Sequence, residues 1–106
     1  MKGIKYDGGK IRASLVLGDF SRSLTEVCRV GTFGAEKYAP SNWLLVDDGV
    51  KRYTDAMLRH WLLEAGGQLL DPETELMHAA HLAWCALARL DLMIRATSLQ
   101  SGDKEA

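Results

Sequence analysis

The sequence predicts an all-α fold, a bundle of three or more helices. Long segments of the chain carry apolar residues at intervals of three and four, the spacing of an amphipathic helix. None shows the sustained apolar and polar alternation of a half-buried strand. A chain of 106 residues fits one domain, which we place at residues 1–98, with a polar tail at 99–106.

The composition narrows the class of protein. Hydrophobic residues make up 47% of the chain and charged residues 25%, as in a globular protein. A net charge of -1 offers no basic surface for nucleic acid, so we expect no nucleic-acid partner. There is no apolar run of the ~20 residues needed to span a membrane, and "MKGIKYDGGK" lacks the apolar core typical of a signal peptide. We therefore expect a cytosolic protein, with Cys28 and Cys85 as buried, reduced thiols.

The first half of the chain predicts one loop and one helix. Residues 1–18 are punctuated by glycine and predict an ordered loop with a short extended piece at 14–17. The first helix is expected to begin near Asp19 or Ser21, because either side chain can cap free backbone amides. Pro40 is expected to end it.

Two further helices are predicted in the second half. One starts after Asp48 and stops at Gly66–Gly67, since glycine favours a helix end. The other is expected to start at Asp71, with Pro72 in the first helical position and two glutamates in the first turn. It should continue to about Ala96.

The last predicted helix is apolar on nearly every side. Leucine and alanine occur all around residues 79–93, which also include Trp84. A helix of this kind must be covered on more than one side. We therefore expect a homo-oligomer whose core is completed by another copy of the chain.

All three histidines of the chain lie in one stretch. His60 and Glu64 are four residues apart, and His78 and His81 are three apart, so each pair shares a helix face. The glycine turn between the two helices would bring both pairs to one site. Imidazole and carboxylate groups so placed can bind a divalent cation. The alternative is a solvated helix surface, with His60 donating to a backbone carbonyl.

Asp71 has two available roles. As a helix N-cap it would contribute about 1 kcal/mol to stability. As a ligand it would bind a cation at the mouth of the histidine site. The spacing alone favours the cap.

Two other segments suggest nucleotide contacts. In "FGAEKYAPSNW", Tyr38, Asn42 and Trp43 offer aromatic faces and an amide, which suit recognition of a base. The alternative, favoured by the residues alone, is that the aromatic rings pack the helix connection. In "DGGKIR", Lys10 and Arg12 lie on a glycine loop that can fold over phosphates. This segment lacks the spacing of a Walker loop.

Four segments together resemble a known family. "KYDGGKIRASLV", "FGAEKYAPSNW", "YTDAMLRH" and "DPETELMHAAH" occur in the order seen in phage-type dATP/dGTP diphosphohydrolases, which are relatives of the MazG-like all-α nucleotide pyrophosphohydrolases. The resemblance runs from about Lys5 to Leu92. It implies a helical bundle assembled as a dimer or tetramer.

The resemblance also implies an activity. A metal-dependent enzyme would cleave a purine deoxynucleoside triphosphate, dGTP or alternatively dATP, to the monophosphate and pyrophosphate. In phages this step feeds the synthesis of 2-aminoadenine nucleotides in the host cytosol. The implied metal is Mg²⁺, with Mn²⁺ or Co²⁺ as alternatives. A different reading is a catalytically inactive module that keeps the bundle and binds nucleotides or supports assembly.

The expected site residues fall into three groups. The expected metal ligands are His60, Glu64, Asp71, His78 and His81. The expected catalytic residues are Glu64, Arg59 and Lys37. The expected substrate-binding residues are Lys10, Arg12, Lys37, Tyr38, Asn42 and Trp43. MazG-like enzymes usually hold magnesium with more acidic residues than this chain has on the matching helices. We expect loss of Glu64 or His78 to abolish turnover and leave the fold intact.

Overall fold

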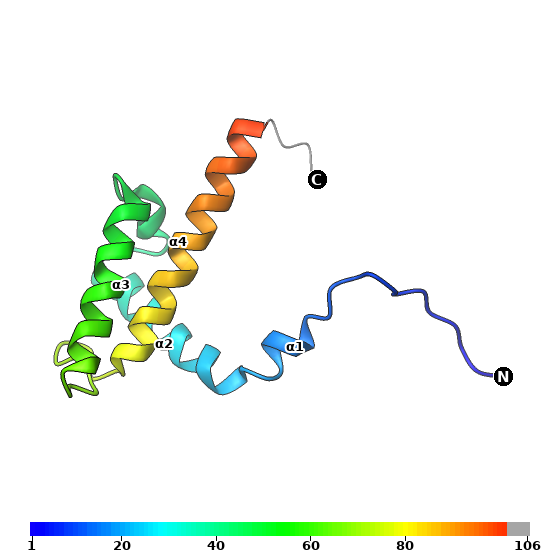
Figure 1. Cartoon of the computed structure of the whole chain (residues 1–106), viewed down its shortest axis with the longest axis horizontal. Coiled ribbons are helices and arrows are strands. Elements are labelled where there is room, and N and C mark those ends of the chain that lie inside the picture. Colours follow the sequence, from blue (N-terminus) through cyan, green and yellow to red (C-terminus); the bar gives the residue numbers. More distant parts are fainter. Residues whose placement is uncertain (102–106) are drawn as a thin grey trace.

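The computed structural model describes residues 1–101 and is helical (Figure 1). Its elements are α1 (Ser14–Leu17), α2 (Ser21–Lys37), the 3₁₀ helix η1 (Asn42–Leu45), α3 (Gly49–Ala65) and α4 (His78–Ser101). No strand occurs in the described part of the chain, although an isolated antiparallel bridge joins Leu70 and Met77. The all-α prediction is confirmed.

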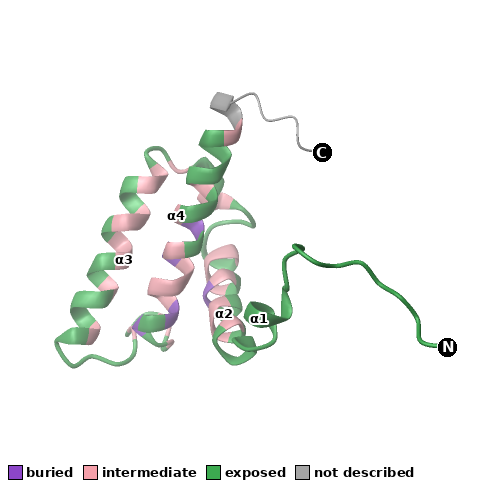
Figure 2. Ribbon diagram, turned by 45° about the vertical axis from the view of Figure 1, so that its right-hand side comes forward, coloured by how far each residue is buried: buried purple, intermediate pink, exposed green. Residues whose placement is uncertain are grey.

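Helices α3 and α4 lie side by side and form the main body of the molecule (Figures 1 and 2). Helix α2 packs against α4, and the short helix α1 contacts α2. The segment before α1 is exposed, has no regular secondary structure and extends away from the bundle (Figure 1). The N-terminal residues therefore make no part of the helical core.

The core is small and centres on α4. The buried apolar residues are Val30 of α2 and Ala80, Cys85 and Ala88 of α4, and His78 has no exposed surface. Small side chains on α4 let the neighbouring helices approach closely. The crossing of α2 and α4 is similarly close, because a Cβ atom at Gly31 would lie 3.3 Å from the indole nitrogen of Trp84.

The first long helix begins at Ser21, as predicted, but the segment before it and its cap differ from expectation. Residues Ser14–Leu17 are a helical turn and not an extended piece. Phe20 occupies the N-cap position of α2, and no side chain caps this end. The chain enters α2 from a preceding helical turn, in which the amide of Phe20 donates to the carbonyl of Val16 at 2.9 Å. Neither Asp19 nor Ser21 therefore acts as the predicted cap.

The last helix begins at His78 and not at Asp71. The Asp71 carboxylate does accept backbone amides, from Glu73 at 2.8 Å and Thr74 at 3.0 Å, but it closes a local turn. Glu75 adopts a left-handed backbone conformation with φ of 61°, which a continuing α-helix cannot contain. Asp71 therefore accepts backbone amides as a cap would, but it does so in a turn that precedes the helix.

The ends and the cysteines also differ from expectation. Helix α4 continues past Ala96 to Ser101, so the first residues of the predicted polar tail are helical, and residues 102–106 lie outside the described part. Both cysteines are free thiols; Cys85 is buried as predicted, whereas Cys28 is exposed. The prediction for Cys28 was wrong because α2 has only Val30 fully buried.

Large apolar side chains remain exposed on α3 and α4. They are Leu58, Trp61, Leu62 and Leu63 on α3, and Leu87, Leu90, Met93 and Ile94 on α4. Each exposes between 45% and 62% of its surface, which is high for residues of this type. Within residues 1–101, no helix is both long enough and apolar enough to cross a bilayer.

Candidate metal and nucleotide site

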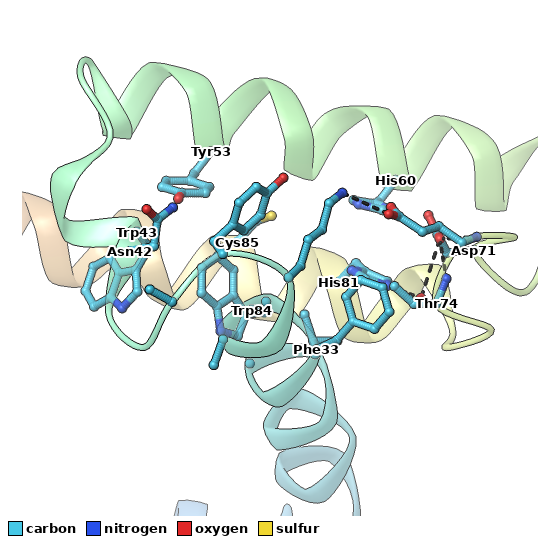
Figure 3. Close-up of a pocket in the computed structure, with 18 of the residues that line it drawn as sticks. Phe33, Asn42, Trp43, Tyr53, His60, Asp71, Thr74, His81, Trp84 and Cys85 are labelled. Atoms are coloured by element: carbon cyan, nitrogen blue, oxygen red, sulfur yellow. Dashed lines mark hydrogen bonds and ion pairs between the residues drawn. The ribbon is translucent and has the colours of Figure 1, made fainter.

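A pocket of about 330 Å³ lies where the end of α2, η1, α3, α4 and the turn before α4 meet (Figure 3). One end is polar and is lined by Lys37, His60, Asp71, Glu73, Thr74 and His81. The other end is aromatic and is lined by Asn42, Trp43, Tyr53 and Trp84 (Figure 3), and Tyr38 and Phe33 also line the pocket. The pocket thus joins a cluster of metal-binding groups to ring surfaces.

The three histidines meet at the polar end. His60 comes from α3, and His78 and His81 come from the first turn of α4. The Nδ1 atoms of His60 and His78 lie 2.8 Å apart, and the Nε2 atom of His78 lies 2.7 Å from the side-chain oxygen of Gln68. The rings of His60 and His81 stack with centroids 4.5 Å apart and planes 9° apart. The predicted meeting of the two histidine segments is confirmed.

Asp71 is held beside the histidines by its own turn. Partial burial raises the pKa of its carboxyl, but the amides of Thr74 and Glu73 and the nearby imidazoles His81 and His60 outweigh this, so the net pKa is lowered. The carboxylate is therefore ionised at neutral pH. Its charge remains available to a cation because the amides that hold it are neutral.

The pocket also keeps His60 and His81 uncharged. Burial lowers the pKa of both rings, and neighbouring imidazoles lower it further. For His81, the Asp71 carboxylate opposes this effect without reversing it. The neutral ring is the form that can donate a lone pair to a metal.

His60, Asp71 and His78 each offer a ligand atom within 4.8 Å of the others. Two imidazoles and a carboxylate suit Mn²⁺, Co²⁺ or Zn²⁺, whereas Mg²⁺ prefers oxygen ligands. The residues present therefore fit a divalent cation. His81 lies next to this group, with its Nε2 atom 2.6 Å from the hydroxyl of Thr74.

Lys37 places a positive charge in the same pocket. Its ammonium group donates to the Glu73 carboxylate at 2.8 Å, and this hydrogen bond is the main reason that the pKa of Lys37 is raised. Both side chains remain substantially exposed. An exposed ion pair of this kind contributes little to stability, so Lys37 can exchange its partner.

The aromatic end is built from rings that meet edge to face. Trp84 lies 6.3 Å from Trp43 and 5.5 Å from Tyr53, measured between ring centroids, with interplanar angles of 84° and 73°. Burial raises the pKa of the Tyr53 hydroxyl. Asn42 brings an amide to the same end (Figure 3). Ring faces with an adjacent donor and acceptor suit a planar heterocycle.

The remaining expected residues lie elsewhere. Glu64 is half-buried on α3 and Arg59 is exposed, and neither lines the pocket. Lys10 and Arg12 are exposed on the segment that runs away from the bundle (Figure 1). Glu64 is also absent from the metal-type group formed by the described residues. The structure thus brings together the expected residues Lys37, Tyr38, Asn42, Trp43, His60, Asp71, His78 and His81.

Several residues of the site had no role in the sequence analysis. They are Tyr53, Gln68, Glu73, Thr74 and Trp84. The helical spacing of Tyr53 and Trp84 is equally consistent with a core position, and Glu73 and Thr74 lie in the segment that the sequence predicts as a helix start. Only the tertiary arrangement of the helices identifies them.

The lowered pKa values predict how stability depends on pH. In the unfolded chain the imidazole pKa is near 6.5, so that chain binds more protons than the folded one below this pH. The contribution of His60 and His81 is thus fully present above pH 6.5 and is lost as the pH falls toward their folded-state values. Urea unfolding in chelator, from about pH 7.5 to 5, should show decreasing stability. His60→Gln should make the slope shallower, and an unchanged slope would contradict this cause.

The fold and the pocket define the class: an all-α protein with a His–Asp group of metal-binding type beside an aromatic pocket. The chain belongs to the family described as dATP/dGTP diphosphohydrolase, N-terminal, whose sequence profile matches residues 1–102. The resemblance found in the four sequence segments is therefore confirmed.

A curated relative supports the same family. The chain is 41% identical over 83 residues to a dATP/dGTP diphosphohydrolase of Salmonella phage PMBT28. The aligned part covers 78% of this chain and 27% of that protein, so the chain spans about a quarter of the relative's length. No solved structure matches the chain.

Proposed function

We propose that this domain hydrolyses a purine deoxynucleoside triphosphate, dGTP or dATP, to the monophosphate and pyrophosphate. The single observation that carries the proposal is that one pocket joins the aromatic end to His60 and Asp71, which form a metal-type group with the buried His78 directly behind them. A triphosphate at the polar end and a purine at the aromatic end would use both. The name of the phage relative supports the choice of substrate.

Each group in the pocket has a role in this proposal. His60, Asp71 and His78 hold a divalent cation, which when bound supplies charge neutralisation and an acidified water. Lys37 leaves Glu73 and pairs with a phosphate oxygen, which lowers the cost of placing negative charge beside Asp71. Trp43 and Asn42 hold the base.

The reaction would be a displacement at the α-phosphorus. A water oxygen would bond to that phosphorus and release a proton to solvent, while the bond from phosphorus to the α–β bridging oxygen breaks and pyrophosphate leaves with the electron pair of that bond. The departing group carries its charge toward Lys37. We propose Mn²⁺ or Co²⁺ as better cations than Mg²⁺, because two of the three donors are imidazole nitrogens.

The test is a panel of triphosphates incubated with each cation and separated by chromatography. We expect deoxynucleoside monophosphate and pyrophosphate from dGTP or dATP, with activity lost in chelator. Release of a diphosphate and inorganic phosphate would show a different reaction. Full activity in chelator would remove the metal from the proposal.

The wider role is also a proposal. Formation of dGMP would feed phage 2-aminoadenine nucleotide synthesis in the host cytosol. A second candidate is a catalytically inactive nucleotide-binding or assembly module, favoured by the single carboxylate in the metal-type group. The two differ in one measurement, since the inactive module would bind dGTP and release no pyrophosphate with any cation.

We also propose that the chain forms a homo-oligomer through its uncovered apolar surface. Side chains such as Leu90 and Ile94 are about half exposed on α4, and their burial against a second copy would be favourable. Sedimentation equilibrium should give a multiple of 11.7 kDa, and Leu90→Glu should shift the distribution toward the monomer. A folded wild-type monomer at micromolar concentration would refute this proposal.

A further inference from the structure

We infer that Gln68 is a positioning residue, which fixes the tautomer of His78 so that its Nδ1 atom carries a lone pair and faces His60. The inference deepens the proposed metal site and rests on it. No sequence pattern assigned this role to Gln68. The evidence is the partner of each nitrogen in the His78 ring.

His78 is sealed inside the protein. It has no exposed surface, so water cannot exchange partners with its nitrogens. Its Nε2 atom lies 2.7 Å from the Gln68 side-chain oxygen, and its Nδ1 atom lies 2.8 Å from Nδ1 of His60. Both ring nitrogens are therefore committed to protein partners.

The identity of the Gln68 atom decides where the proton lies. A carbonyl oxygen can only accept, so Nε2 of His78 must carry the hydrogen. A neutral imidazole has one N–H group, so Nδ1 of His78 carries a lone pair. In the metal-free protein Nδ1 of His60 must then donate to it. The side-chain amide of Gln68 thus sets the tautomers of both His78 and His60.

This arrangement prepares His78 as a ligand. A histidine that binds a metal through one nitrogen usually donates its other N–H to an oxygen, which orients the ring and raises its basicity. Gln68 supplies that oxygen to Nε2, which leaves Nδ1 for the cation. Without Gln68, the proton could move to Nδ1 and block the ligand position.

The backbone holds Gln68 in place from both sides. Gly67, in the turn after α3, has φ of 104°, a conformation that other residues rarely adopt. The Gln68 amide donates to the carbonyl of Leu63 at 3.0 Å, and the His78 amide donates to the carbonyl of Leu69 at 3.0 Å. The turn therefore ties both members of the pair to the same short stretch of chain.

Nitrogen-15 NMR of the histidine rings tests the inference directly. The chain has three histidines, so the ring signals are few, and His81→Gln assigns one set. In chelated protein at about pH 8, where imidazole is neutral, we expect Nε2–H on His78 and Nδ1–H on His60. Nδ1–H on His78 in the wild type would overturn the inference, with no variant required.

Two substitutions distinguish the hydrogen-bonding effect of the Gln68 side-chain oxygen from the effect of the size of the side chain. Gln68→Glu keeps an acceptor and should retain the wild-type tautomers. Gln68→Met keeps similar length without an acceptor, should lose the fixed Nε2–H state of His78, and should weaken Mn²⁺ binding by about 10–100-fold in calorimetry. Wild-type tautomers and affinity in the Met variant would show that Gln68 positions nothing.

These measurements require no turnover. A protein with the expected tautomers and Mn²⁺ affinity that releases no pyrophosphate would refute the proposed function and leave the role of Gln68 standing. A protein that turns over dGTP with Nδ1–H on His78 would do the opposite. The two failures are therefore distinguishable.

Discussion

Replacement of Asp71 by asparagine is expected to lower turnover of dGTP by at least about 100-fold, since a direct ligand should matter at least as much as a second-shell group. The charged carboxylate lies within 4.8 Å of the ligand atoms of His60 and His78. Asparagine keeps the size of the side chain and an oxygen that can accept the amides of Glu73 and Thr74. The local turn should therefore persist while cation affinity falls. Pyrophosphate release across a Mn²⁺ titration measures the effect, and thermal unfolding checks the fold.

Glu75→Gln is the matched control for this experiment. It makes the same change from carboxylate to amide in the same turn, but Glu75 is exposed and outside the metal-type group. Its turnover should stay within about twofold of wild type, as for other exposed sites. Equal losses in both variants, or normal turnover in Asp71→Asn, would exclude Asp71 as a ligand.

The structure makes Asp71 a better probe than Glu64 or His78, the two residues whose loss was expected from the sequence to abolish turnover. His78 is fully buried, so His78→Ala would leave a cavity and unpaired groups on His60 and Gln68. Each unsatisfied buried group costs about 1–3 kcal/mol, so this variant is expected to lose stability together with activity. Glu64 does not line the pocket, so its proposed catalytic role has to be tested on its own with Glu64→Gln.

Trp43→Ala is expected to raise the KM for dGTP by roughly 5- to 150-fold with a smaller effect on kcat. The range corresponds to the loss of about 1–3 kcal/mol of stacking between a base and an aromatic ring. Trp43 lies at the end of the pocket far from His60 and Asp71 (Figure 3). It should therefore contribute to binding and not to the chemical step. Initial rates over a range of dGTP concentrations separate the two constants.

Two variants control for general effects of losing an indole ring. Trp43→Phe keeps an aromatic face and should recover most of the wild-type KM. Trp61→Ala removes an indole that is 51% exposed on α3 and does not line the pocket, so its KM should change little. An unchanged KM in Trp43→Ala would remove the base from this end of the pocket.

Much of the fold was predictable because apolar residues that recur every three or four positions are a strong indication of a helix. The second predicted helix matches α3 at both ends, since Asp48 and the Gly66–Gly67 pair mark a real start and stop. The third start failed because Asp71 and Pro72 form an equally good signal for a turn. Sequence alone does not reveal the left-handed backbone of Glu75 that ends this turn.

The site was predictable only where its residues form a recognisable local pattern in the sequence. Clustered histidines are uncommon enough to indicate a site, and the pocket does contain His60 and His81. Glu64 shares a helix face with His60 in the sequence pattern, but in the structure it does not line the pocket. Gln68 could not be predicted, because its role depends on the distance between one oxygen and one buried nitrogen.

The two thiols of the chain differ in a way that makes one of them a natural reporter. Cys28 is exposed on α2, whereas Cys85 lies in the pocket wall with its pKa raised to about 11 by burial. Because alkylating reagents attack the thiolate, we expect the exposed Cys28 to react first and Cys85, which is buried and has a raised pKa, to react slowly. With Cys28 blocked, the rate of Cys85 alkylation therefore records how often this wall of the pocket opens, and a ligand that closes the pocket slows it.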